Sequence, residues 1–178
     1  GDVNASPETI LSPFLLTPPM NRIDPEKGQT LRISYPGGKN LPKDRESLFW
    51  VNVLEIPPRA NDSATPNHLQ VAFRSRIKLF FRPAQLTGDA YHAAESVHWA
   101  AQGNALVAKN DSPYYVNLLG VHTTGNIHKI IAEGDMISPY STITVKVNAG
   151  GTLRSGDKLS YDFINDWGAV KTAEFILN

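Results

Sequence analysis

The sequence predicts an all-β protein that consists of two immunoglobulin-like β-sandwich domains. β-Branched and aromatic residues alternate with polar ones in short runs, which Gly, Pro, Asn and Asp bound. Helical periodicity is hard to find anywhere in the chain. Short strands at this spacing are typical of immunoglobulin-like sandwiches.

The expected strands follow one another with turns between them. Those turns include Ile56-Pro57-Pro58 and Asn110-Asp111-Ser112-Pro113, whose residue types favour chain reversal. In order, the strands are expected at Gln29–Tyr35, Leu48–Glu55, Leu69–Phe81, Ala105–Lys109, Tyr114–His122, Ile127–Ala132, Thr142–Val147, Lys158–Ile164 and Ala169–Leu177. Trp50, Trp99 and Trp167 are expected to pack in or near the cores.

The stretch HLQVAFRSRIKLFFRP, His68 to Pro83, predicts a long strand with two unlike faces. Successive side chains of a strand point to opposite sides. Leu69, Val71, Phe73, Ile77, Leu79 and Phe81 then share one face, interrupted only by a serine, while the arginines and Lys78 lie on the other. Such a strand spans on the order of 40 Å, more than a compact sheet needs. The surplus apolar positions therefore either lie under a second layer or wait for another chain.

A hinge is expected at Arg82 to Gly88, where Pro83 stops the long strand. The chain therefore divides near residue 84, into an N-terminal domain at 1–83 and a C-terminal domain at 84–178. The first part holds three clear strands, which cannot close a two-layer core. Its front strands are expected to be missing from this chain.

Composition argues against several classes of function. Lys and Arg together number 17, as do Asp and Glu, so a nucleic-acid partner is not expected. With no cysteine, disulfides and thiolate catalysis are excluded. No apolar run reaches the ~18 residues that membrane insertion needs. The histidines lack the spacing of a metal site, and no nucleophile motif is present, so we expect no metal, no cofactor and no enzymatic activity.

Five motifs in register resemble one family, the periplasmic chaperones of the chaperone–usher pilus pathway, which are PapD-like. The family's fold is a pair of immunoglobulin-like domains in a boomerang arrangement. The matching pieces are SPFLLTPPMNRIDP (Ser12–Pro25), LPKDRESLFWVNVLEIPP (Leu41–Pro58), LQVAFRSRIKLFFRP (Leu69–Pro83), NDSPYYVNLLG (Asn110–Gly120) and YDFINDWGAV (Tyr161–Val170).

The resemblance implies that the long strand binds pilus subunits. Leu69, Val71 and Phe73 would fill the open core of a subunit sandwich by β-strand addition. Lys78 would hold the terminal carboxylate of that subunit. From the residues alone, the apolar row could instead cover this protein's own core, and the lysine could be a solvated strand residue.

The resemblance also implies an ionic network between the domains. Arg82 would bridge Glu46 of DRESLFW and Asp166 of INDWG, and so fix the angle between the domains. The alternative is three unrelated surface charges.

The expected function is that of a non-enzymatic periplasmic chaperone that caps pilus or fimbrial subunits by donor-strand complementation and delivers them to an outer-membrane usher. No cofactor or nucleotide is required for this. The exposed donor strand leaves self-association open. Two alternatives remain, a β-sandwich adhesion or carbohydrate-binding module, and a sandwich-fold hydrolase.

Overall fold

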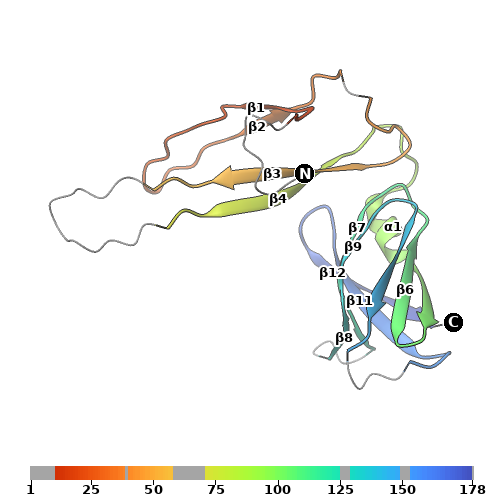
Figure 1. The fold of residues 1–178 in the computed structure, drawn as a ribbon. Helices are drawn as coiled ribbons and strands as arrows, with labels where there is room; N and C mark the ends of the chain where they lie inside the picture. The colour runs from red at the N-terminus through yellow and green to blue at the C-terminus, as the bar shows by residue number, and fades with distance from the viewer. Residues whose placement is uncertain (1–10, 39, 58–70, 125–128, 149–152, 178) are drawn as a thin grey trace, which may run out of the picture. The chain divides into compact units, whose positions relative to one another are not determined.

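The computed structural model describes residues 11–38, 40–57, 71–124, 129–148 and 153–177. Among these, strands dominate and one short helix is present, in agreement with the predicted all-β class (Figure 1). The chain forms two units, one that ends at Leu41 and one that begins at Pro42. That separation does not test the division expected near residue 84, which stays a prediction.

In the described part of the first unit, two short strands form an antiparallel pair. β1 (Leu15–Thr17) pairs with β2 (Arg32–Ser34), and the rings of Phe14 and Tyr35 beside them lie 5.8 Å apart. β2 is shorter than the strand predicted at Gln29–Tyr35. β1 was not predicted, because three residues are too few to show an alternating pattern.

The second unit begins with a hairpin of β3 (Ser47–Leu54) and β4 (Arg74–Phe81). Their antiparallel register runs from the Ser47–Phe81 pair to the Leu54–Arg74 pair. The prediction that this strand begins at Leu69 is wrong where it can be tested, because Val71 to Phe73 lie outside β4. β3 ends just before Pro57, which cannot donate to a ladder, so β4 loses its partner there. Leu69 itself lies outside the described residues.

The remainder of this unit is a β-sandwich, called here the C-terminal sandwich, which starts at α1 and ends at β12 (Figure 1). One sheet has the order β10-β6-β5, and the other has β12-β11-β7-β8 with β9 also paired to β7. The elements are α1 (Ala90–Glu95), β5 (His98–Gln102), β6 (Ala105–Asn110), β7 (Val116–Thr123), β8 (Ile130–Glu133), β9 (Met136–Ile137), β10 (Ser141–Lys146), β11 (Lys158–Ile164) and β12 (Val170–Ile176).

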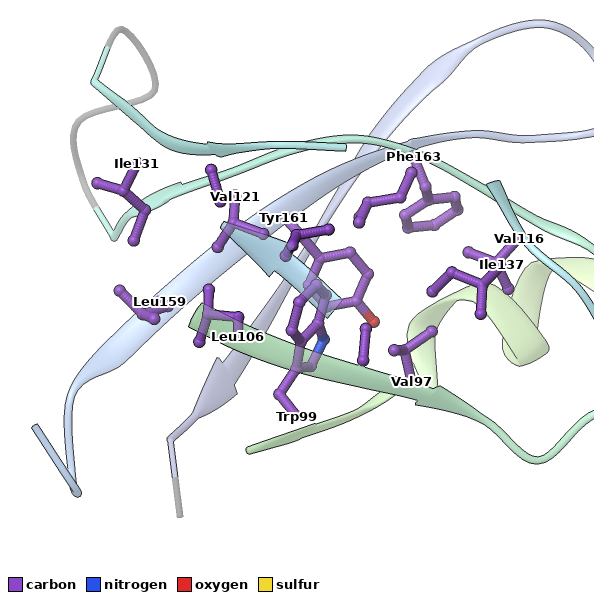
Figure 2. Close-up of a cluster of buried hydrophobic side chains, with 14 of the residues drawn as sticks. Val97, Trp99, Leu106, Val116, Val121, Ile131, Ile137, Leu159, Tyr161 and Phe163 are labelled. Carbon is purple, nitrogen blue, oxygen red and sulfur yellow. The ribbon is translucent and has the colours of Figure 1, made fainter. Parts of the chain in front are cut away.

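The core of this sandwich lies between its two sheets (Figure 2). Trp99 is buried as predicted and stacks on Phe175 with ring centroids 4.8 Å apart. Tyr161 is fully buried, and its hydroxyl donates to the carbonyl of Ala94 at 2.7 Å. Burial raises the pKa of Tyr161 to about 12. The ring therefore belongs to a dry core whose polar tip is satisfied.

The buried side chain of Asn110 fixes the turn that leads into β7. Its amide nitrogen donates to the carbonyls of Tyr114 and Ser138, at 2.7 and 3.1 Å, and its oxygen accepts from the Ser112 backbone at 3.0 Å. The Tyr114 hydroxyl donates in turn to the Gly88 carbonyl at 2.9 Å. This turn therefore holds the start of β7 against the segment that follows β4.

Two sequence expectations differ from the structure. α1 has six residues, too few to show helical periodicity, and its first turn is capped by the Asp89 carboxylate, which accepts from the His92 backbone at 2.9 Å. Trp167 is 83% exposed at the turn between β11 and β12, and Trp50 is 37% exposed, so neither is a core residue. Tryptophans in turns and on hairpins are not forced inward by an alternating pattern.

Candidate functional site

The β3–β4 hairpin carries the row that sequence analysis assigned to subunit binding. In the register, Val51 faces Ile77 and Trp50 faces Lys78, so odd-numbered residues of both strands share the apolar face. Ile77 is 56% exposed on that face. Val71 and Phe73 continue the same parity beyond the end of β4 and are 49% and 63% exposed. These two side chains are therefore open to a partner.

β4 offers an edge as well as a face. Among the described strands, it pairs with β3 alone. The backbone N–H of Glu55 donates to the Phe73 carbonyl at 2.9 Å, which extends the ladder one step past the strand end. An exposed apolar row beside such an edge is a template for adding a further strand.

Lys78 lies on the opposite face, at a groove of about 650 Å³. Its Nζ donates to the side-chain oxygen of Asn117 at 2.8 Å. Asn117 is a neutral group on β7, and no carboxylate of the described residues lies within ion-pair distance of Lys78. The groove lining also includes Arg76, Phe80, Tyr115, Ile164 and Asp166. A cation with an uncharged partner at an open groove is suited to binding an anion.

Arg82, at the end of β4, joins the other two predicted network residues. Its Nε donates to Glu46 Oε1 at 2.6 Å, and its two terminal nitrogens donate to Asp166 at 2.6 and 2.9 Å. The Arg82 guanidinium also lies 5.2 Å from the Tyr114 ring centroid. The hydrogen bonds to Asp166, and then the one to Glu46, raise the pKa of Arg82, while the hydrogen bonds from Arg82 lower the pKa of Asp166.

Glu46 is the buried member of this network, with 3% of its surface exposed. Its second carboxylate oxygen accepts from the Tyr115 backbone at 2.7 Å, and its own N–H donates to the Pro113 carbonyl at 2.9 Å. A buried carboxylate must be paired, because its desolvation is costly. Glu46 and Arg82 together thus attach the hairpin to the start of β7.

The structure brings Glu46, Arg82 and Asp166 into one cluster and places Lys78 at the groove beside them. Sequence reasoning missed Asn117, the partner of Lys78. The alternation of β7 could have indicated its direction. Val116 and Leu118 on either side of Asn117 are apolar and buried, so Asn117 points outward from the core.

A hydrolase has little support from the described residues. Ser160 Oγ lies 2.9 Å from His122 Nδ1, and His122 Nε2 lies 3.2 Å from an Asp162 oxygen without hydrogen-bond alignment. Ser160 and His122 are 3% and 1% exposed, so no substrate reaches them. Among the described residues no group of side chains is suited to hold a metal, and no helix is long and apolar enough to span a membrane.

Comparison with known families identifies the class of protein. Residues 2–87 match the model of the pili and flagellar-assembly chaperone, PapD N-terminal domain. Residues 92–175 match that of the pili assembly chaperone PapD, C-terminal domain. The chain therefore belongs to the PapD-like pilus-assembly chaperones, which confirms the resemblance predicted from its motifs.

Individual relatives and solved structures belong to the same class of chaperones. The chaperone protein HifB of Haemophilus influenzae is 38% identical over 99% of this chain and 72% of its own length. The crystal structure of the chaperone YadV, a probable fimbrial chaperone of Escherichia coli, superposes with a TM-score of 0.78 at 37% identity, over 97% of this chain and 81% of that one. A complex of the Salmonella enterica SafA pilin with the SafB chaperone gives a TM-score of 0.80 at 29% identity, covering 96% and 77%. The two-domain, all-β fold of this family is thus confirmed.

Replacing Asp166 with asparagine tests the ionic network. Because Arg82 lowers the pKa of Asp166, the carboxylate stabilises the fold above its ordinary pKa, and this contribution is lost as pH falls through the lowered value. We expect Asp166→Asn to reduce the free energy of unfolding by at most about 1 kcal/mol at neutral pH, since the pair is half-exposed. Chemical denaturation at several pH values measures this.

The difference in stability between the two proteins should fade as pH falls through the lowered pKa of Asp166, because the carboxyl of the unmodified chain then becomes protonated as well. Glu174→Gln removes a charge from an exposed residue of β12 and serves as the control. A difference that persists undiminished in acid would show that the charge of Asp166 is not its cause.

Proposed function

We propose that this chaperone caps pilus subunits in the periplasm by donating the edge of β4, and delivers them to an outer-membrane usher. The observation that carries the proposal is the exposed pair Val71 and Phe73 beside an edge strand whose other face presents Lys78 to a groove. The SafA pilin complexed with the SafB chaperone supports a pilin as the partner. Residues 1–83 and 84–178 are the two domains of the proposal.

Donation uses the backbone edge and the apolar face of one strand for different purposes. The backbone of β4 would extend the subunit's sheet, while Leu69, Val71 and Phe73 would enter its incomplete core. Burying each large apolar side chain contributes ~1.5–3 kcal/mol before ordering costs. Several kcal/mol from three residues is enough to hold a subunit and still allow its later transfer to a better strand.

Lys78 would set the register of the added strand. Arg82 is already paired with Glu46 and Asp166, so its charge is largely neutralised. Lys78 donates its hydrogen bond to a neutral amide, so its charge is not compensated there and is available to pair with the subunit's terminal carboxylate. A fixed carboxylate at Lys78 leaves one alignment of the subunit along β4, with the apolar row opposite the open core.

The adhesion or carbohydrate-binding alternative is weaker. Sugar binding of that kind uses a platform of exposed aromatic rings. Of the tryptophans, Trp99 is buried, and Trp50 is covered by the Arg76 guanidinium at 4.2 Å from its ring centroid. Trp167 alone among them is broadly exposed.

Changing Leu69, Val71 and Phe73 together to serine tests the donor row. Because these side chains would be buried in the subunit, we expect the affinity for a pilus subunit to fall by at least about 100-fold, the equivalent of roughly 3 kcal/mol. The melting temperature of the free chaperone should stay within a few degrees of the original. Titration calorimetry with a purified subunit measures the affinity.

Ile130→Ser is the matched control, since Ile130 is 46% exposed on β8 in the C-terminal sandwich. It should leave the affinity unchanged. Capture of subunits by the triple variant at the original affinity would refute donation by this row.

Lys78→Met tests the carboxylate anchor while keeping most of the apolar stem. The unmodified chaperone should bind a subunit with a free C-terminal carboxylate at least about 10-fold more tightly than the same subunit with an amidated C-terminus, because a charge pair is lost. The variant should bind both forms equally weakly. Lys146→Met on β10 is the control for loss of an exposed lysine. Discrimination that survives in Lys78→Met would assign the carboxylate to another cation.

A further inference from the structure

Tyr140 has a backbone conformation that a tyrosine rarely adopts. Its φ is +53°, in the left-handed region, where a side chain crowds the following carbonyl. It is 50% exposed, so burial of its ring in the core does not explain the strain. Its N–H donates to the Ser112 carbonyl at 3.2 Å, which holds the backbone in place. Strain of this kind persists where neighbouring contacts require it.

The side chain of Tyr140 contacts the segment that leads into β3. Its ring lies 5.0 Å from the guanidinium carbon of Arg45, within the range of a cation–π contact. Its hydroxyl donates to the backbone carbonyl of Asp44 at a long 3.4 Å. The carboxylate of Asp44 accepts from Arg45 at 2.7 Å and orients the guanidinium. Two contacts thus hold this exposed side chain, and the ion pair of Asp44 with Arg45 supports one of them.

This contact is separate from the Arg82 network. Asp166 follows β11 of the five-stranded sheet, whereas Tyr140 directly precedes β10 of the three-stranded sheet. The hairpin is therefore attached to both sheets of the C-terminal sandwich. Glu46 and Lys78 also contact the five-stranded sheet, at Tyr115 and Asn117. A contact with the other sheet further restricts rotation of the hairpin about those points.

We propose that Tyr140 and Arg45 form a second latch, which fixes the orientation of the β3–β4 hairpin on the C-terminal sandwich. They are positioning residues, because they act through Lys78 and the groove and do not touch the subunit. The functional part of this inference rests on the proposed capture of subunits. Without the latch, the orientation competent for capture is populated less, and the apparent affinity falls in proportion.

Tyr140→Gly separates the latch from the stability of the fold. Glycine adopts a φ of +53° without strain, so the sandwich should melt at or near the original temperature while the ring is lost. Tyr140→Phe keeps the ring over Arg45 and loses only the long hydroxyl contact, so it should behave like the unmodified chain. Arg45→Gln should reproduce the effect of Tyr140→Gly.

Orientation is measured by electron paramagnetic resonance distances between two spin labels. The chain has no cysteine, so Asn52→Cys on β3 and Glu174→Cys on β12, both exposed, provide unique attachment points. We expect Tyr140→Gly to broaden this distance distribution and Tyr140→Phe to leave it unchanged. A second pair, Lys146→Cys with Glu174→Cys, lies within the sandwich and should be unaffected.

Subunit affinity in the same variants completes the test. Loss of one exposed cation–π contact should shift the orientation equilibrium by about two- to fivefold. The affinity for a subunit should weaken by the same factor, because only the competent orientation captures it. An unchanged hairpin-to-sandwich distribution in Tyr140→Gly overturns the latch, as does equal broadening within the sandwich. If the unmodified chaperone captures no subunit, the proposed function is overturned. The distance measurement still tests whether Tyr140 and Arg45 fix the orientation of the hairpin.

Discussion

The pairing of Arg82 with Glu46 is the interaction on which the site depends. Glu46 is buried, and a buried carboxylate without a cation would be too costly to keep charged. Arg82, the residue directly after β4, supplies that cation, and its two terminal nitrogens donate to Asp166, which lines the same groove. The C-terminal end of β4, the strand proposed to be donated, is therefore held by charged residues that also line the groove.

Strand parity separates the two roles of β4. Phe73 and Lys78 are five residues apart in number and so lie on opposite faces, roughly 16 Å apart along an extended chain. Lys78 would fix the end of a bound partner, and the apolar row that includes Phe73 would fix the direction in which the partner runs along the strand. The polar face needs no apolar partner, since Arg76 stacks on Trp50 there. One strand can thus hold a carboxylate and fill a core without conflict.

Sequence patterns predicted much of this, and physical reasons explain the rest. Strands with clear alternation, such as β11, were placed to the residue, whereas α1 and β9 are too short to carry a period. β4 begins late because pairing depends on where β3 ends, a property of the partner strand. The Arg82 cluster was predicted from the family motifs. Alternation along β7 indicates that Asn117 points outward, but its pairing with Lys78 and the strained backbone of Tyr140 depend on contacts between distant segments, which no local pattern encodes.

Amide hydrogen exchange on β4 tests the central claim most directly. The Glu55 to Phe73 hydrogen bond shows that odd residues direct their backbone groups toward β3, so the amides of Ala72 and Arg76 point toward the other edge. If β4 is donated, binding of a pilus subunit will slow exchange at Ala72 and Arg76. If exchange at both stays as fast in the complex as in the free chaperone, no strand has been added and the account is wrong.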